Sequence, residues 1–319
     1  MNPDVLLLII FGSLLGAFIL FYIIPCFIIS YVIFRVLLVR TDPQKWSRTV
    51  SWEDDEQQQM FDEGKVWGEK YDEYRKQVSI VSGKFRLVGE YFDFGAKKVA
   101  LIIPGRMESG TYSYYFSEPY RALGYNILAI DNRSHGLSDG RYNTVGMKEY
   151  KDILKWLEFA HDELHNESVI IHGICIGSAT ALNALVDKKC PDYVEALIAD
   201  GMYINFQENF KNHLIERKKP LVPFTQMFMF ILTLVAKRSP NTYSPINEIG
   251  QLKIPLLLIY SREDIYSTHQ YGQVLFEKCG SKKKRIKLFK HGAHSHVRIN
   301  DVEKYDKTIK DFVEEVVNA

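Results

Sequence analysis

The most constraining stretch of the sequence runs from Val169 to Ala184 and reads VIIHGICIGSATALNA. It opens with a short β-branched run, which is typical of a strand buried in a parallel sheet. The turn GICIG follows at Gly173–Gly177, and small residues and helix formers come after it. Strand, tight turn and helix in this order predict a nucleophile elbow, with Cys175 at the position that more often holds serine.

The glycines that flank this turn have a physical reason. A nucleophile elbow is strained, and strand and helix can pack this closely only if the flanking residues lack side chains. Such a turn exposes Cys175 at the carboxyl end of the sheet, beside the amino end of a helix, where partial positive charge favours an anion. The alternative is a structural cysteine, because free cysteine is among the most buried residue types.

Composition narrows the function classes. The 319 residues include 40 basic and 39 acidic side chains, so the near-neutral chain is not expected to bind nucleic acid or a strongly charged substrate. Its four cysteines are Cys26, Cys175, Cys190 and Cys279, and they form no CxxC, zinc or disulfide pattern. We therefore expect a reducing compartment, no metal and no cofactor.

The N-terminal residues 1–40 are predicted to be a membrane anchor. Val5–Phe34 contains no charged residue, and about 20 apolar residues suffice to cross a hydrocarbon core of about 30 Å. We expect one tilted span, kinked at Pro25. A cleavable signal peptide is the alternative, but the start Met1–Asp4 lacks basic residues and no small-x-small site follows the apolar run.

Flanking charge predicts the orientation of this anchor. Arg35, Arg40, Lys45 and Arg48 all follow the apolar run, and no Lys or Arg precedes it. The positive-inside rule then predicts a single-pass protein of the cell membrane, with the catalytic domain in the cytoplasm.

After the anchor, residues 41–76 read as a polar linker, Thr41–Trp52, and an amphipathic helix from about Glu53 to Lys76. Residues 77–319 read as one α/β domain in which strands and helices alternate, which predicts a mostly parallel, doubly wound sheet. The expected strands are Val78–Val81, Phe85–Phe94, Val99–Ile103, Asn126–Ile130, Val169–His172, Ala196–Ala199, Pro255–Tyr260 and Arg285–Phe289. The expected helices are Thr111–Leu123, Thr144–Glu163, Ser178–Lys188, Tyr266–Cys279 and Val302–Val317.

The alternation breaks over about residues 202–252, which we interpret as a helical cap. Within it, Leu221–Ala236 is apolar nearly all round but short for a membrane span. Two interpretations are compatible with each other. The segment is a helix packed over the sheet, or it is a cap that lines an acyl pocket and touches the bilayer.

A nucleophile requires a base and a group that orients the base. The base candidate is His294, in a loop that also holds His291 and His296, both expected at the surface. No nearby Asp, Glu or Cys completes a metal-ligand spacing with these histidines. The acid candidate is Asp264, which follows the strand Pro255–Tyr260, and its rivals are Glu263 and Asp200.

Backbone donors for an oxyanion are expected at Ile176, directly after the nucleophile, and at Arg106, which follows the strand Val99–Ile103 through Pro104 and Gly105. The chain order nucleophile, acid, base is that of α/β hydrolases.

The chain resembles the α/β-hydrolase superfamily, and most of all the membrane-anchored bacterial hydrolases of the serine aminopeptidase and monoglyceride-lipase-like group. Asp131–Gly140 reads DNRSHGLSDG and is similar to that group's D-x-R-G-H-G-x-S-x-G stretch. The elbow, Ile254–Asp264 and the Gly-Ala-His of residues 292–294 extend the resemblance over about Val78–Val317. It implies an α/β-hydrolase fold in which the 131–140 loop is mainly structural.

By position, the resemblance implies a catalytic triad of Cys175, Asp264 and His294, with backbone oxyanion donors at Arg106 and Ile176. Three residues depart from the family pattern: Cys175 replaces serine, Pro104 stands where His-Gly is common, and Ser134 replaces a glycine.

We therefore expect a hydrolase that cleaves carboxylic esters or thioesters of small-molecule or lipid-like, apolar acyl substrates through an S-acyl enzyme, with peptidase activity as a further possibility. Two alternatives stay open at this point. One is an acyltransferase that uses the same intermediate, and the other is a non-catalytic membrane protein that keeps the fold.

Overall fold

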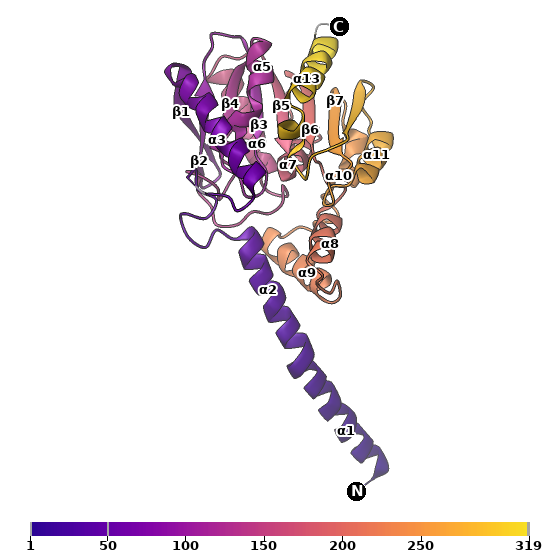
Figure 1. Cartoon of the computed structure of the whole chain (residues 1–319). Coiled ribbons are helices and arrows are strands. Elements are labelled where there is room, and N and C mark those ends of the chain that lie inside the picture. The colour runs from indigo at the N-terminus through magenta and orange to yellow at the C-terminus, as the bar shows by residue number, and fades with distance from the viewer. Residues whose placement is uncertain (1, 50, 318–319) are drawn as a thin grey trace.

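The computed structural model describes residues 2–49 and 51–317. Its centre is a sheet of eight strands in the order β1-β2-β4-β3-β5-β6-β7-β8 (Figure 1). The strands β3 to β8 run parallel, whereas β1 and β2 form an antiparallel hairpin around residues 83 and 84. The strands are β1 Arg75–Ser82, β2 Phe85–Phe92, β3 Lys98–Ile103, β4 Asn126–Ile130, β5 Ser168–Ile174, β6 Val194–Asp200, β7 Leu256–Ser261 and β8 Lys284–Phe289. The predicted mostly parallel, doubly wound sheet is confirmed.

Helices cover both faces of the sheet. On one face lie α6 Tyr150–Asp162, α7 Ile176–Leu185 and α11 His269–Lys278, and on the other α3 Asp55–Lys70, α5 Glu118–Ala122 and α13 Val302–Val317 (Figure 1). Strand β3 shows why the sheet is buried on both sides. Val99 and Leu101 pack into the core of the first face, and Ala100 and Ile102 into the core of the second. Side chains that alternate in direction and are all apolar are typical of a central parallel strand.

Three predicted helices differ most from the structure. The helix expected from about Glu53 to Lys76 ends at Lys70, and a 3₁₀ turn Asp72–Tyr74 leads into β1. The expected helix Thr111–Leu123 is broken into α4 Gly110–Ser113, a 3₁₀ turn Tyr114–Phe116 and α5, where Pro119 is favoured in the first turn of a new helix. The expected helix Thr144–Glu163 begins only at Tyr150, because the Glu149 carboxylate accepts hydrogen bonds from the backbone N–H groups of Thr144 and Gly146. Local side-chain hydrogen bonds of this kind compete with helix formation.

The N-terminal segment forms one helix, Pro3–Leu38, of 36 residues, and its most apolar 18-residue stretch has a mean hydropathy of 2.7. It is long and apolar enough to cross a membrane. In place of the expected kink at Pro25, the π-helical turn Ile19–Ile23 joins α1 Pro3–Phe18 to α2 Ile24–Leu38. A π-turn just ahead of a proline accommodates the lost backbone hydrogen bond, and Figure 1 shows a single rod that leaves the domain.

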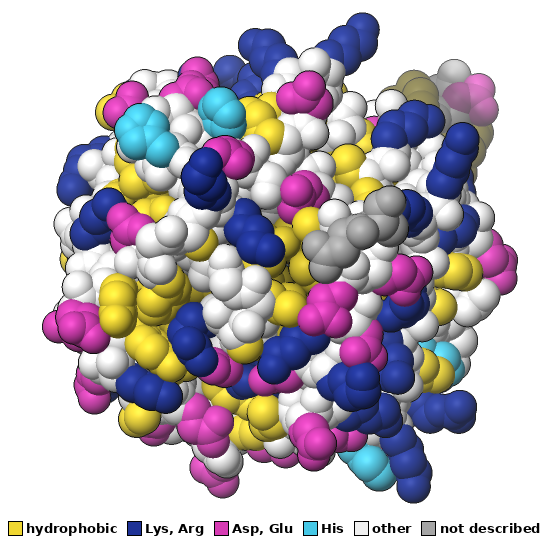
Figure 2. Space-filling model, turned by 90° about the horizontal axis from the view of Figure 1, so that it is seen from above, with side chains coloured by type: hydrophobic (Ala, Val, Ile, Leu, Met, Phe, Trp, Pro, Cys, Tyr) yellow, Lys and Arg dark blue, Asp and Glu magenta, His cyan; other side chains and the backbone are white. Residues whose placement is uncertain are grey.

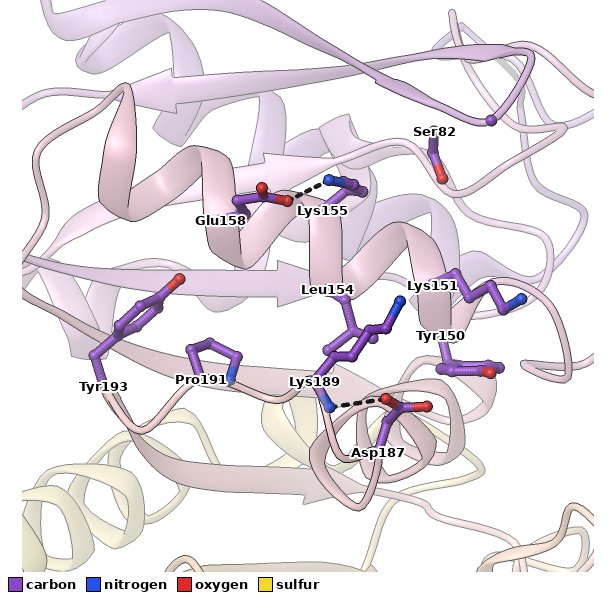
Figure 3. A pocket seen from close by; sticks show the side chains of 11 residues that line it. Ser82, Tyr150, Lys151, Leu154, Lys155, Glu158, Asp187, Lys189, Pro191 and Tyr193 are labelled. Carbon is purple, nitrogen blue, oxygen red and sulfur yellow. Dashed lines mark hydrogen bonds and ion pairs between the residues drawn. The ribbon is translucent and has the colours of Figure 1, made fainter.

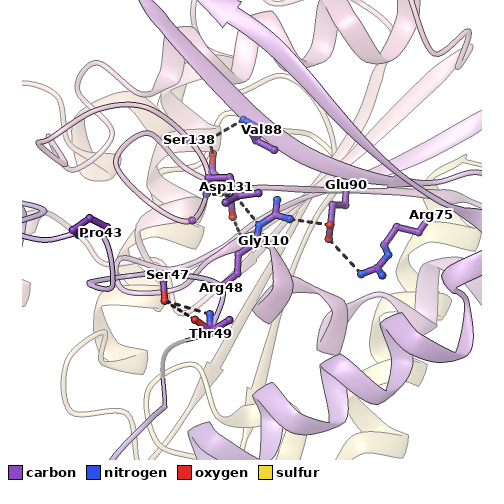
Figure 4. Close-up of polar contacts among 12 residues, drawn as sticks. Pro43, Ser47, Arg48, Thr49, Arg75, Val88, Glu90, Gly110, Asp131 and Ser138 are labelled. Carbon is purple, nitrogen blue, oxygen red and sulfur yellow. Dashed lines mark hydrogen bonds and ion pairs between the residues drawn. The ribbon is translucent and has the colours of Figure 1, made fainter.

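The predicted linker Thr41–Trp52 is docked on the domain, and Val50 within it lies outside the described residues. Figure 4 shows the contact that holds it. The Arg48 guanidinium donates to Asp131 at 2.9 Å and pairs with Glu90 at 2.8 Å. Asp131 is buried and also accepts from the backbone N–H of Gly110 at 2.7 Å. Arg48 is one of the basic residues from which the orientation was predicted, and it also fixes the linker to the loop after β4.

The insert between β6 and β7 contains α8 Phe206–Glu216, α9 Phe224–Ala236 and the short α10 Pro245–Glu248. The expectation that its apolar helix packs over the sheet is wrong, because α9 packs on α2 and α8. Phe228 of α9 stacks on Phe210 with ring centres 4.1 Å apart and meets Phe34 of α2 edge-on at 6.0 Å. The opposite face of α9 is open, and Phe230 and Leu234 are 55% and 58% exposed.

Between the sheet and α13 lies a buried polar cluster. The Tyr305 hydroxyl donates to the Asp200 carboxylate at 2.6 Å and lies 3.3 Å from Nε2 of His172. Burial is the main cause that raises the pKa of Asp200 to about 7. At lower pH, Asp200 is therefore a neutral acid in the folded chain.

This cluster predicts a pH-dependent stability. The unfolded-state pKa of an aspartate is about 3.9, so the folded state holds a proton between about pH 4 and 7 that the unfolded state has released. As the pH rises through this window, we expect the free energy of unfolding of the wild type to fall, relative to that of Asp200→Asn, by up to about 1.4 kcal/mol per pH unit. Denaturant unfolding of both proteins in detergent at several pH values measures it, and parallel curves would contradict it.

Candidate functional site

The turn between β5 and α7 holds Cys175 in a strained conformation, with φ +52° and ψ −112°. Its flanking glycines are sterically required. A Cβ on Gly177 would lie 2.3 Å from the carbonyl oxygen of Ile103, and one on Gly173 would lie 2.5 Å from the backbone of Ser178. These approaches bring β3, β5 and α7 together. They leave Cys175 half-buried, so that its thiol is not sealed in the core.

The close approach at Gly177 is testable by Gly177→Ala. Its methyl group collides with a central strand, and we expect a loss of about 1–3 kcal/mol in the free energy of unfolding, together with slower alkylation of Cys175. The matched control is Gly250→Ala, because a Cβ at Gly250 has its nearest neighbour at 3.6 Å. Equal stability of the two variants would show that the turn tolerates a side chain.

His294 and Asp264 meet at the carboxyl ends of the strands. Nδ1 of His294 lies 2.7 Å from Oδ2 of Asp264. The other carboxylate oxygen accepts the backbone N–H groups of Tyr266 and Ser267, both at 2.8 Å. Burial alone lowers the pKa of His294, but the negative charges of Asp264 and of the Cys175 thiolate outweigh it and hold the pKa well above its usual value. The arrangement turns Nε2 of His294, which has no hydrogen-bond partner within the described residues, away from Asp264.

The rival residues have other partners. Glu263 is exposed and pairs with His291 at 2.8 Å, and Asp200 accepts from Tyr305 in the core. His291 lies at the surface as expected, but the same expectation for His296 is wrong. His296 is buried and contacts Glu56 of α3 at 3.1 Å. Within residues 2–49 and 51–317, no three His, Cys, Asp or Glu side chains gather in a group that could hold a metal.

Cys175, His294, Arg106 and Ile176 line a single cavity of about 380 Å³. A larger cavity of about 680 Å³ lies elsewhere, between α6 and the segment after α7 (Figure 3). It is bordered by Lys155, which pairs with Glu158, and by other surface residues, and its described lining contains no cysteine or histidine. The smaller cavity is the candidate active site because its lining includes both the Cys175 thiol and the His294 imidazole.

The loop that carries Arg106 is fixed on three sides. Its backbone carbonyl meets Nε2 of His135, and the His135 ring stacks on Trp46 with centres 4.5 Å apart. The Arg106 guanidinium donates to the carbonyl of Leu37, at the end of the anchor helix, at 3.1 Å. In the residue directly before Arg106, the N–H of Gly105 donates to Glu108 at 2.6 Å. Arg106 is thus held in the lining of the cavity that contains Cys175.

Sequence reasoning missed three residues of this cavity. Glu108 is buried, and burial raises its pKa to about 7. His213 comes from α8 of the insert and stacks on Tyr266 at 3.8 Å, and burial lowers its pKa to about 3. Tyr203 follows β6. No motif marks His213 or Tyr203, and the only signal for Glu108 is an acidic side chain three residues after Gly105 in a turn that must satisfy buried N–H groups.

The Asp264–His294 pair predicts the effect of Asp264→Asn. The amide removes the charge that most raises the pKa of His294, so this pKa falls toward its ordinary value of about 6.5. NMR titration of the imidazole measures the change, with Glu263→Gln as the control because Glu263 pairs with His291 instead. An unchanged pKa of His294 in Asp264→Asn would contradict the pairing.

Several known proteins are similar to this chain. The model of the alpha/beta hydrolase fold family matches residues 99–245. The uncharacterized protein YqkD of Bacillus subtilis is 28% identical over 194 residues, which are 60% of this chain and 63% of YqkD. The uncharacterized membrane protein YNL320W of Saccharomyces cerevisiae is 21% identical over 216 residues, or 67% of this chain and 70% of that protein. The match to YqkD thus spans less than two thirds of its length.

Among solved structures, the Pyrococcus furiosus esterase Pf2001 superposes with a TM-score of 0.65 at 21% sequence identity, covering 78% of this chain and 94% of the esterase. At this identity the likeness shows the fold, which agrees with the sheet order and the elbow described above.

Proposed function

Because the chain has the α/β-hydrolase fold, we propose that it is a membrane-anchored acyl hydrolase that uses Cys175 as its nucleophile. In this proposal His294 is the general base, Asp264 orients it, and the backbone N–H groups of Arg106 and Ile176 receive the oxyanion. One observation carries the proposal: the strained turn presents Cys175 to the same cavity as an imidazole that is hydrogen-bonded to a buried carboxylate.

The chemistry follows from these positions. Sγ of Cys175 attacks the carbonyl carbon of an ester or thioester, and the carbonyl oxygen becomes an oxyanion. The tetrahedral intermediate collapses, and His294 gives a proton to the leaving alcohol or thiol. Water then attacks the S-acyl bond while His294 takes its proton. The second tetrahedral intermediate then breaks its C–S bond, which releases the acid and leaves Cys175 as a thiolate beside the protonated His294, so the enzyme is regenerated.

Electrostatics support this assignment of roles. The raised pKa of His294 favours a protonated imidazole beside Cys175, which is the arrangement in which cysteine nucleophiles form a thiolate–imidazolium pair. Asp264 accepts the Nδ1–H, so Nε2 is the nitrogen that exchanges a proton with the reacting groups. The same S-acyl intermediate serves an acyltransferase, and analysis of the released product distinguishes the two activities.

Two features support an apolar substrate at a membrane. The cavity is lined in part by Ile176, Tyr203, Phe206 and Ile265, which suit a hydrocarbon chain. The helix Pro3–Leu38 serves as the anchor in this proposal, and the basic residues after it favour a cytoplasmic domain at the inner face of the cell membrane.

The proposed nucleophile predicts the outcome of a substitution series with the full-length protein in detergent. Cys175→Ala removes the attacking atom, and we expect turnover of p-nitrophenyl butyrate to fall by at least about 10³-fold, with the loss of iodoacetamide labelling at this position. Cys190→Ala is the matched control, because Cys190 is a half-buried thiol outside the cavity.

Turnover at equal rates in Cys175→Ala and the wild type would remove Cys175 from the mechanism. Activity that is absent from the wild type but gained in Cys175→Ser would identify the chain as one that keeps the fold without hydrolysing esters.

A further inference from the structure

A second apolar cavity lies between the anchor helix and the insert, with a volume of about 440 Å³. One wall is the exposed side of α2, and the other is formed by α8 and the start of α9. Figure 1 shows α8 and α9 beside α2, at the end of the domain from which the helix emerges. We call this cavity the anchor groove, and its apolar lining comprises Ile29, Val32, Val36, Phe210, Leu214 and Phe224.

The anchor groove adjoins the candidate active site. Arg106 and His213 line both cavities, so the groove begins where the cavity that contains Cys175 ends. The Arg106 guanidinium donates to the carbonyl of Leu37 at 3.1 Å. This hydrogen bond holds the Arg106 side chain at the junction, so that it does not cross the groove. A chain that fills the anchor groove therefore points its end past these two side chains toward the thiol.

The surroundings of the groove suit contact with a bilayer. A helix of 36 residues is about 54 Å long at about 1.5 Å per residue, which exceeds a hydrocarbon core of about 30 Å. Next to α2, the insert exposes Phe230 and Leu234 on one side of α9. The opposite end of the domain differs, because basic, acidic and apolar side chains are interspersed there (Figure 2).

Three cations line the anchor groove: Arg106 at its junction with the active site, and two further basic side chains. Arg217, at the C-terminal end of α8, and Lys219, in the following loop, line the groove together with the apolar residues. Both side chains are exposed, so they can pair with a phosphate while they stay partly hydrated. Cations beside an apolar slot at the membrane surface match the headgroup and the chain of an anionic lipid.

We propose that the anchor groove binds one acyl chain of an anionic bilayer phospholipid, with its phosphate at Arg217 and Lys219, and directs the chain's ester toward Cys175. The membrane helix then has two functions, because it anchors the domain and forms one wall of the substrate site. This inference rests on the proposed hydrolase function for the ester's fate, but not for the binding itself.

Binding is tested without turnover. Full-length Cys175→Ala protein in nanodiscs is irradiated with phosphatidylglycerol that carries a diazirine in one acyl chain, and the labelled peptides are identified by mass spectrometry. We expect label on residues 206–224, and a fall of at least fivefold in Val36→Trp, whose indole fills the groove. The matched control is Val5→Trp, because Val5 is an exposed valine on the same helix but outside the groove.

The headgroup is tested by the double variant Arg217→Gln/Lys219→Gln. We expect it to reduce labelling by phosphatidylglycerol several-fold and labelling by phosphatidylcholine less, because the choline of phosphatidylcholine offsets the charge of its phosphate. Equal labelling by both lipids in the parent protein would overturn the anionic preference. Stronger labelling by a diazirine fatty acid than by phosphatidylglycerol would overturn a bilayer phospholipid as the occupant.

Turnover separates this inference from the proposed function. With wild-type Cys175 restored, we expect Val36→Trp to lower the ratio of phosphatidylglycerol cleavage to p-nitrophenyl butyrate cleavage about tenfold, and Val5→Trp to leave it unchanged. Butyrate turnover with an unaltered ratio would overturn the groove while sparing the hydrolase. Groove labelling without any ester turnover would overturn the hydrolase while sparing the groove.

Discussion

The candidate site depends on the approach of α7 to the central strands. The carbonyl of Ile103 would lie 2.3 Å from any Cβ at Gly177, so a glycine is the only residue that allows the helix to begin there. This proximity forces Cys175 to φ +52° and aims it out of the core, at the point where β5 ends. The strained backbone conformation of Cys175 thus keeps its sulfur atom from being sealed in the core.

The other site residues are positioned by the same edge of the sheet. Asp264 follows β7 and His294 follows β8, and parallel strands deliver both to the carboxyl end, where Cys175 lies. The loop of Arg106 follows β3 but takes its shape from elsewhere. The carbonyl of Arg106 contacts His135, which stacks on Trp46 of the linker, and its guanidinium binds the carbonyl of Leu37 in α2. The N-terminal helix and the linker are therefore part of the structure around the site.

The sequence predicted features that depend on local patterns. The elbow is contiguous, and Asp264 and His294 each follow a strand by a few residues, so local patterns and the family resemblance together made them candidates. The structure also shows why the family pattern has a glycine at position 134. Ser134, which stands in place of a glycine, has a φ of +68°, a conformation that favours glycine.

What the sequence did not predict depends on packing between distant segments. The apolar helix α9 was expected over the sheet, but its partner is α2, some 200 residues away in the chain. His213 shows no local sign of its place at the cavity, because only the docking of the insert puts it there. The break at Tyr114–Phe116 has the same origin, since these aromatic side chains are buried in the core of one sheet face at the expense of a regular helix.

The central claim is that Cys175 carries the acyl group during turnover. The most direct measurement is intact-protein and peptide mass spectrometry of wild type mixed rapidly with p-nitrophenyl butyrate and quenched in acid. The account predicts a butyryl group on the peptide that contains Cys175, removable by hydroxylamine at neutral pH. Release of p-nitrophenol with the butyryl group on another residue, or with no acylated peptide under conditions that trap thioesters, would contradict it.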